Sequence, residues 1–170
     1  MAVSDSNGTV HSPEGLDLDA LIRLKDAGKS VVEHAKAPLP PEAVITLGCD
    51  ILVPAATPDV ITKDNASDIQ ASLILQGANI PATAEAEQIL FERGIVVVPD
   101  FIANAGGVIM AAMEYAGRME KEAFEAISTR IRENTRQVLD RARAEKSLPR
   151  QAAIAIATER ISRAMGYREF

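Results

Sequence analysis

Three short apolar runs, separated by stretches with helical spacing, constrain the fold of this chain more than any other feature. They lie at residues 50–53, 72–75 and 95–98, and the last consists of one isoleucine and three valines, which favour strands. Polar and apolar residues do not alternate within them, so each strand is expected to be buried on both faces. The pattern predicts an α/β fold in which helices cover both faces of a parallel sheet, with right-handed crossovers.

The chain before these runs carries weaker signals. We expect, in order, a strand over residues 1–4, a turn at Asn7 and Gly8, a helix over 16–27, a small strand over 30–33 and a short helix beginning at Pro41. Gly28 fits the position just past the end of a helix. Proline is favoured in the first turn of a helix, which supports the start at Pro41.

Helical signals dominate the chain after the first run. We expect a polar helical stretch over 62–71, a helix from Thr83 to Gly94, a glycine-rich loop over 104–107, and helices over 109–116, 120–146 and 151–165. Thr83 is a good N-cap residue. On the long helix, several apolar residues fall near one face: Phe124, Ile127, Ile131, Val138 and Leu139. We therefore divide the chain into a sheet-containing core, residues 1–117, and carboxyl-terminal helices that pack on it, residues 118–170.

Composition disfavours several classes of partner. The formal net charge is −6 and no basic run occurs, which argues against nucleic acid and anionic membranes. No apolar run approaches the roughly 18 residues that span a bilayer, and the first residues lack the pattern of a secretion signal. We expect a cytoplasmic protein that acts on small molecules or on other proteins.

The single cysteine and the two histidines indicate no metal or disulfide chemistry. Cys49 cannot form an internal disulfide, and with only His11 and His34 beside it a zinc site is not expected. We expect Cys49 to be a small core residue and both histidines to lie at the surface. The sequence therefore predicts no metal site.

Candidate ligand-binding residues follow the predicted strands. In open parallel sheets, ligands bind at the carboxyl ends of the strands. Those ends here are Asp5 and Ser6, Ala55 and Ala56, residues 76–79, and residues 100–107. Small side chains let a flat ring or a ribose approach the backbone, while Asn, Gln and Asp supply directed hydrogen bonds. This mixture suits a nucleotide or a dinucleotide.

Each of these residues also has a structural interpretation. Asp5 either accepts hydrogen bonds from ribose hydroxyls or caps the turn that follows it. Asn79 and Asn104 either orient a carboxamide or satisfy loop backbone, and paired glycines such as Gly106 and Gly107 most often end a loop before a helix. None of the ten glycines falls into the G-x-G-x-x-G or G-x-x-x-x-G-K-[ST] pattern, so the chain lacks the usual cradle for a pyrophosphate.

Four ordered segments carry a resemblance to a known family. They are Val-Ser-Asp-Ser at 3–6, Cys-Asp-Ile-Leu-Val-Pro-Ala-Ala at 49–56, Gln-Gly-Ala-Asn at 76–79, and Val-Val-Pro-Asp-Phe-Ile-Ala-Asn-Ala-Gly-Gly-Val at 97–108. Together they resemble the carboxyl-terminal, coenzyme-binding domain of the glutamate/leucine/phenylalanine/valine dehydrogenases, with glutamate dehydrogenase the closest. The resemblance covers nearly the whole chain and implies an incomplete Rossmann-like sheet.

The resemblance implies a coenzyme, NAD or NADP, and the residues that hold it. By position, Asp5 and Ser6 would meet the adenosine ribose, and Ala55 and Ala56 would line the adenosine side. Asn79 would lie at the nicotinamide ribose, with Gln76, Gly77 and Ala78 in contact with the coenzyme beside it. Asn104 would bind the nicotinamide carboxamide. Enzymes of this family transfer hydride between the α-carbon of an amino acid and the nicotinamide, and ammonia is released. The protein's share is to orient the reacting ring.

The resemblance also implies what this sequence lacks. The family's opening strand, its glycine-rich loop and its substrate domain with the catalytic lysine and aspartate have no counterpart here, so no catalytic residue is assigned. In the family the missing strand is central, between the strands at Val3 and Ile51, and its loss would expose backbone donors and acceptors. We therefore expect the chain to close this gap, to pair with a second copy, or to be a fragment of a longer enzyme.

Ala111 stands where the glutamate enzymes usually carry a serine that reaches the distal carboxylate of the substrate. An alanine cannot donate a hydrogen bond, so an apolar amino acid, or none, fits better than glutamate. The sequence thus predicts the coenzyme-binding portion of an NAD(P)-dependent, glutamate-type dehydrogenase, an oxidative deaminase that is inactive alone and forms a homo-oligomer. A non-catalytic nucleotide-binding or assembly protein derived from the family, and purely structural association through the long helices, stay open as alternatives.

Overall fold

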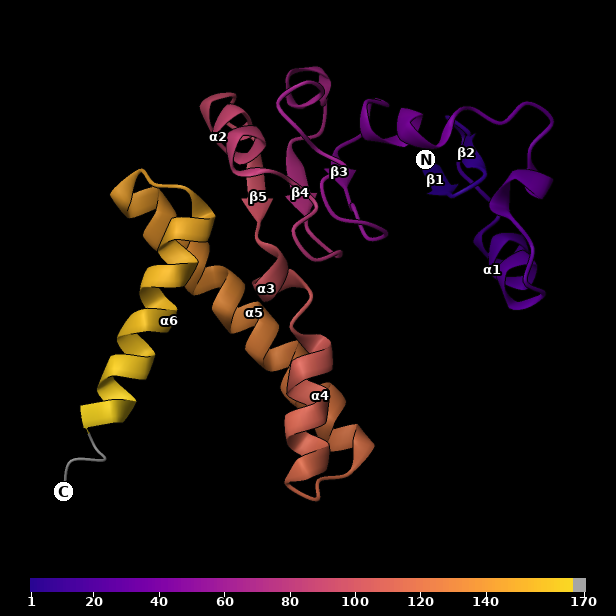
Figure 1. Ribbon diagram of the computed structural model, residues 1–170. Helices are drawn as coiled ribbons and strands as arrows, with labels where there is room; N and C mark the ends of the chain where they lie inside the picture. The colour runs from indigo at the N-terminus through magenta and orange to yellow at the C-terminus, as the bar shows by residue number, and fades with distance from the viewer. Residues whose placement is uncertain (167–170) are drawn as a thin grey trace.

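The computed structural model describes residues 1–166, which form two small sheets followed by long carboxyl-terminal helices (Figure 1). The strands are β1 (Ala2–Asp5), β2 (Gly8–His11), β3 (Ile51–Leu52), β4 (Leu73–Leu75) and β5 (Val96–Val98). The α-helices are α1 (Leu18–Asp26), α2 (Ala84–Glu92), α3 (Asp100–Ala103), α4 (Gly106–Tyr115), α5 (Glu120–Glu145) and α6 (Pro149–Gly166). Short 3-10 helices lie at η1 (Val31–His34), η2 (Pro41–Ile45) and η3 (Ala66–Asp68).

The three apolar runs form a parallel sheet, as predicted. Its order is β3-β4-β5, with Ile51 opposite Leu73 and Leu75 opposite Val98. Helix α2 packs against β5. The surrounding core is built largely from aliphatic side chains that are fully buried, among them Ile61, Ile69, Ile74 and Leu90. The α/β fold class with carboxyl-terminal helices is therefore confirmed.

The N-terminal unit, residues 1–45, has a sheet and a core of its own. The predicted turn at Asn7 and Gly8 folds the chain back, so that β1 pairs antiparallel with β2. Its buried core consists of three side chains, Val10, Leu21 and Val31. Figure 1 shows this unit beyond β3, at the side of the parallel sheet opposite β5.

This arrangement corrects one expectation about the strands. The strand at Val3 does not belong to the parallel sheet, because the tight turn lets it pair locally with Val10 and its neighbours. Within the described residues β3 pairs only with β4, and Ile51 and Val53 beside the free edge are 53% and 54% exposed. The gap expected next to β3 is therefore not closed by β1.

One short helix connects the N-terminal unit to the parallel sheet. Pro41 begins η2, as predicted, and η2 packs on β1 and β2. Thr9 and Leu39 exchange backbone hydrogen bonds just before it (2.8 and 2.9 Å). At its end, the Ile45 side chain is buried in the larger core together with Leu52 and Ile61. Ile45 thus belongs to both parts of the chain.

Two local predictions are wrong. Residues 30–33 form no strand, because the Ser30 side chain accepts a hydrogen bond from the Val32 N–H and starts η1 instead. The stretch 62–71 is helical only at η3, because the Asn65 side chain bonds the Thr62 N–H and the Val60 carbonyl (both 2.9 Å). In both places a short polar side chain competes with the regular backbone pattern.

The predicted helices after the sheet are confirmed with shifted ends. Thr83 caps α2 through its hydroxyl, which accepts from the Ala86 N–H (3.2 Å). The loop expected at 104–107 is reduced to residues 104 and 105, because α4 already begins at Gly106. Phe124, expected on the apolar face of α5, is 57% exposed near the start of that helix.

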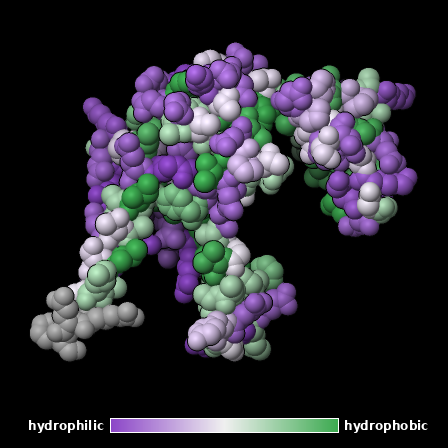
Figure 2. All heavy atoms as spheres, viewed as in Figure 1, coloured by the Kyte–Doolittle hydropathy of each residue, from purple (hydrophilic) through white to green (hydrophobic). Residues whose placement is uncertain are grey.

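Helices α5 and α6 diverge from their connection near Leu148, and α4 packs along the first part of α5 (Figure 1). Figure 2 shows hydrophobic residues at the surface of the α4–α5 end and of α6. Val108, Tyr115 and Met119 are 78%, 97% and 70% exposed. No helix in residues 1–166 combines the length and the apolar character needed to cross a membrane.

Candidate functional site at the carboxyl end of the parallel sheet

The carboxyl ends of β4 and β5 bring two of the predicted segments together. The Gln76 N–H donates to the Val98 carbonyl (3.2 Å), which extends the pairing of these strands by one residue. Pro99 follows β5 and directly precedes α3, and Asn104 ends that short helix. The loop after β4 and the residues after β5 therefore share one edge of the sheet, as expected for parallel strands.

The chain after β3 packs directly on the loop after β4. The N–H groups of Gly77 and Ala78 both donate to the Pro54 carbonyl (3.0 and 2.9 Å). A β-carbon at position 77 would lie only 3.0 Å from the β-carbon of Ala55, so any larger residue there would crowd the chain after β3. Ala55 and Ala56 stay exposed at the same edge.

Asn79 and Asn104 form a side-chain pair at this edge. Asn104 Nδ2 donates to Asn79 Oδ1 (2.8 Å) and lies 3.4 Å from the Gly77 carbonyl. Among the described residues, Asn79 Nδ2 and Asn104 Oδ1 have no hydrogen-bond partner, which leaves one amide donor and one amide acceptor for a ligand. The backbone-satisfying interpretation therefore accounts for only part of their hydrogen-bonding capacity.

A groove of about 790 Å³ opens beside this pair. Its sheet side is formed by Asn79, Phe101 and Asn104, and its helical side by polar residues of α5 and α6. The polar residues are Arg130, Glu133, Asn134, Gln137 and Arg160. Charged residues on a long helix are typical of a solvated face, and in the structure those of α5 and α6 line this groove.

A cluster of charged and polar side chains is connected to the loop that carries Asn79, because Asp100 accepts from the Ile80 N–H (2.8 Å). Arg150, in the first turn of α6, donates to both carboxylate oxygens of Glu87 (2.8–3.0 Å), to Asp100 Oδ1 (2.9 Å) and to Gln76 Oε1 (2.9 Å). Gln76 Nε2 donates to Glu87 (2.9 Å), and the Asp100 N–H donates to Gln76 Oε1 (3.0 Å). Arg150 also lies over the Phe101 ring, 5.5 Å from its centroid. Every member of the cluster is therefore hydrogen-bonded, as burial requires.

Asp100 and Arg150 stabilise each other's charge. Burial raises the pKa of Asp100, but hydrogen bonds from the Ile80 N–H and from Arg150 outweigh it and hold that pKa below its ordinary value. Burial lowers the pKa of Arg150, and the carboxylates of Glu87 and Asp100 outweigh it and raise that pKa. Asp100 and Arg150 therefore stay charged over the whole physiological range.

Sequence reasoning missed Arg150 and Glu87. The available signal was Glu87 itself, a charged residue beside Ala86 and near Leu90, which are both fully buried on α2. A buried carboxylate needs a cationic partner. The identity of that partner was not readable, because Arg150 lies 63 residues further along the chain.

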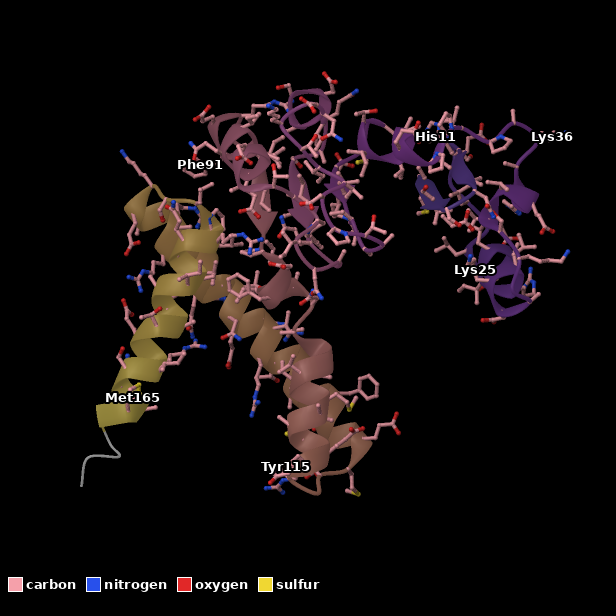
Figure 3. All side chains as sticks on the ribbon, in the orientation of Figure 1. His11, Lys25, Lys36, Phe91, Tyr115 and Met165 are labelled. Atoms are coloured by element: carbon pink, nitrogen blue, oxygen red, sulfur yellow. The ribbon has the colours of Figure 1, made fainter. Side chains whose placement is uncertain are left out.

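The structure places Asp5 and Ser6 away from this edge, in the N-terminal unit, where Figure 3 shows Lys25 on α1. Asp5 accepts hydrogen bonds from the N–H groups of Asn7 and Val31 (both 3.0 Å), the Ser30 hydroxyl (2.9 Å) and Lys25 Nζ (3.1 Å). Burial raises the pKa of Asp5, but these donors lower it well below its usual range. Asp5 thus makes the turn contact that its structural interpretation predicts.

The remaining candidates lie as follows. Ala111 is exposed on α4, one turn beyond the groove residue Val108. Cys49 is exposed, so the prediction that it is a core residue is wrong; residues 46–50 connect η2 to β3 over the surface. His11 and His34 are exposed, as predicted. Residues 1–166 contain no group of three or more His, Cys, Asp or Glu side chains placed to hold a metal ion.

The comparison with known proteins decides the family. Residues 1–168 match the sequence profile of the glutamate/leucine/phenylalanine/valine dehydrogenases. The chain belongs to this dehydrogenase family. The family resemblance carried by the four sequence segments is thereby confirmed.

Curated relatives agree with this assignment. A glutamate dehydrogenase from Aeropyrum pernix is 39% identical over 99% of this chain and 43% of its own length. An NAD-specific glutamate dehydrogenase from Staphylococcus aureus is 36% identical over 99% of this chain and 42% of its own length. An NADP-specific glutamate dehydrogenase from Halobacterium salinarum is 40% identical over 82% of this chain and 33% of its own length. The chain thus spans less than half the length of the relatives it matches.

A solved structure has the same fold. The hetero-hexameric glutamate dehydrogenase from Thermus thermophilus, in its leucine-bound form, superposes with a TM-score of 0.83 at 29% identity. The match covers 98% of this chain and 41% of that one.

Proposed function

We propose that this chain is the coenzyme-binding portion of a nicotinamide-dependent amino-acid dehydrogenase, an enzyme of oxidative deamination. The observation that carries the proposal is the Asn79–Asn104 pair, which lies beside a groove at the carboxyl end of a parallel sheet in a member of this family. Ligands of open parallel sheets bind at that end. We keep the division into residues 1–117 and 118–170 as part of this proposal; residues 167–170 lie outside the described chain.

The side chains present at this edge fit the nicotinamide end of a dinucleotide. Asn79 Nδ2 and Asn104 Oδ1 offer a donor and an acceptor, which match the oxygen and nitrogen of a carboxamide. Gly77 carries no side chain and those of Ala55 and Ala56 are small, so a ribose can approach the backbone at this edge. A bound coenzyme supplies hydride transfer, and the protein binds and orients it.

The other assignments rest on the family resemblance. Gln76 is engaged with Arg150 and Asp100, so its contribution to the coenzyme site is through the shape of the loop it begins. Ala55 and Ala56 are proposed for the adenosine half. Asp5 and Ser6 are proposed for the adenosine ribose, for which Asp5 would exchange its contacts with Ser30 and Lys25 for ribose hydroxyls. NAD and NADP both remain candidates, since relatives specific for each are similar to this chain.

The proposed substrate is an amino acid with an apolar side chain. Ala111 offers no hydrogen bond to a distal carboxylate, and its neighbour Val108 is strongly exposed on the same face of α4. Turnover is proposed to need residues outside this chain, because none of its residues is assigned a catalytic role. We further propose a homo-oligomer; the relative from Thermus thermophilus is hetero-hexameric, which supports assembly into an oligomer.

Calorimetric titration of the chain with NAD⁺, NADP⁺ and ADP tests the proposal. We expect one of the two dinucleotides to bind, and Asn104→Ala to weaken its binding by about tenfold, the loss of roughly one hydrogen bond. Gln88→Ala removes an exposed amide on α2 and is expected to leave the affinity unchanged. Absence of binding by all three nucleotides would contradict the proposal.

The same titration separates the alternatives. Binding without turnover of glutamate or leucine, even when the remainder of a family enzyme is supplied in trans, favours a non-catalytic nucleotide-binding protein. The absence of any nucleotide binding favours structural association through α5 and α6, whose exposed apolar residues are the observation behind that alternative.

A further inference from the structure

Arg150 joins the start of α6 to the edge of the sheet where the coenzyme is proposed to bind. Its side chain is only 25% exposed, and those of Glu87 and Asp100 are 5% and 9% exposed. One cation here faces two buried carboxylates. Its planar guanidinium reaches Glu87, Asp100 and Gln76 at the same time, a geometry that a lysine ammonium cannot reproduce.

Asp100 connects Arg150 to the loop that carries Asn79. One carboxylate oxygen, Oδ1, accepts from Arg150 (2.9 Å), while the other, Oδ2, accepts from the backbone N–H of Ile80 (2.8 Å). The Asp100 carboxylate is therefore held by Arg150 of α6 through one oxygen, and it holds the peptide that follows Asn79 through the other.

The hydrogen bond to Asp100 helps to hold an unfavourable backbone conformation at Ile80. Its φ angle is +48°, a left-handed conformation that is an outlier for a β-branched residue. Its side chain is 59% exposed, so side-chain packing contributes little to holding this conformation. The backbone is held instead by hydrogen bonds, from the Ile80 N–H to Asp100 and from the Asp59 N–H to the Ile80 carbonyl (2.9 Å). Strain of this kind persists only where the surroundings impose it.

We propose that Arg150 is a positioning residue which, through Asp100 and the strained Ile80 peptide, sets the orientation of Asn79 and of its partner Asn104. The role in coenzyme binding rests on the proposed function, whereas the mechanical link does not. Arg150 belongs to α6, so the carboxyl-terminal helices help to shape the site and do not merely cover the sheet.

Arg141 provides a matched control. It joins α5 to α6 through Glu159, bonds Glu145 in its own helix, and has a 27% exposed side chain, close to that of Arg150. It makes no described contact with the loop after β4. A merely structural role for Arg150 predicts that Arg141→Met and Arg150→Met act alike on the site.

Amide hydrogen exchange of the full chain tests the link without any coenzyme. We expect Arg150→Met to speed exchange of the Ile80 amide by at least about tenfold, Arg150→Lys to give an intermediate rate, and Arg141→Met to leave it unchanged. Arg150→Lys retains the charge and keeps the test available if Arg150→Met does not fold. An Ile80 amide rate unchanged in Arg150→Lys, or raised equally in Arg141→Met, would overturn the proposal.

Rescue by a second substitution tests the link to the site. Glycine adopts a positive φ without strain, so Ile80→Gly reduces the need for the Asp100 hydrogen bond. We expect Arg150→Lys to weaken dinucleotide binding by about tenfold and Ile80→Gly to restore most of that loss. The loss of binding without rescue would contradict positioning through Ile80. If the unmodified chain binds no dinucleotide, the proposed function fails, while the exchange rates still decide the link.

Discussion

Asp5 accepts four hydrogen bonds, and every donor belongs to the N-terminal unit. The folded chain holds its pKa well below the ordinary value of 3.8, against the opposing effect of burial. A carboxyl group whose pKa is lowered by folding stabilises the fold at pH values above its ordinary pKa. This contribution is lost as the pH falls below that ordinary pKa toward the lower pKa of the folded state.

Acid sensitivity of the fold is therefore expected to depend on Asp5. Asp5→Asn should lower the urea midpoint of unfolding at about pH 6. The decrease of that midpoint between about pH 6 and pH 3 should be smaller in Asp5→Asn than in the unmodified chain, because an amide does not titrate. Urea unfolding at both values measures this difference. Glu14→Gln, an exposed residue of the same unit, should behave like the unmodified chain. An equal acid-induced drop in Asp5→Asn would contradict the role of Asp5.

Residues differ in how far the sequence alone predicts them. Asn79 and Asn104 are predictable because both follow strands, and strand ends of a parallel sheet meet at one edge. Both interpretations of Asp5 follow from the sequence, but the choice between them depends on Ser30 and Val31, whose contact with Asp5 is set by the path of the chain through α1. Arg150 carries no local signal, because its partners come from other elements far away in the sequence.

At the scale of elements, α2 depends on its cap. Thr83→Ala should lower the free energy of unfolding by about 1 kcal/mol, since the Ala86 N–H loses its acceptor. Thr83→Ser keeps the hydroxyl and should restore most of that loss. Chemical denaturation of the three proteins provides the measurement, and equal stabilities of the alanine and serine variants would contradict the capping role.

The α-helices that were predicted correctly have long apolar periodicity or a clear cap, as α2 and α5 do. The local errors fall on short or irregular segments. Residues 62–71 contain enough helix-forming residues to suggest a helix, yet one asparagine side chain, that of Asn65, diverts the backbone at their start. The four-residue helix α3 escaped prediction because Pro99 and Asp100 are also typical of a loop.

At the scale of the whole molecule, the free edge of β3 has a predictable effect. An exposed apolar edge strand offers unpaired backbone groups to another chain. We expect the mass measured by sedimentation velocity to rise above 18.2 kDa with concentration. Ile51→Lys should shift it back toward that of one chain, because an edge lysine opposes pairing.

A control for this experiment lies on η3. Ser67 is exposed and does not belong to the β3 edge, so Ser67→Lys adds the same single positive charge away from the pairing surface. We expect this variant to associate like the unmodified chain. Association that is equally strong in Ile51→Lys, or equally weakened in Ser67→Lys, would contradict pairing through β3.

The arrangement of the whole chain was the least predictable level. The parallel sheet followed from three apolar runs, but the separate hairpin of β1 and β2 did not, because the same strand at Val3 suits a local partner or a distant one. The choice is made by the turn at Asn7 and Gly8, which brings the local partner within reach at a small cost in chain entropy.

The position of Ile45 has a consequence for how the chain unfolds. It sits at the end of η2, which packs on the hairpin, yet its side chain fills space beside Leu52 and Ile61. Separation of the hairpin together with η2 would remove this side chain from its place beside Leu52 and Ile61. Unfolding of the N-terminal unit is therefore expected to loosen the packing around Leu52 and Ile61 as well, although each part has a core of its own.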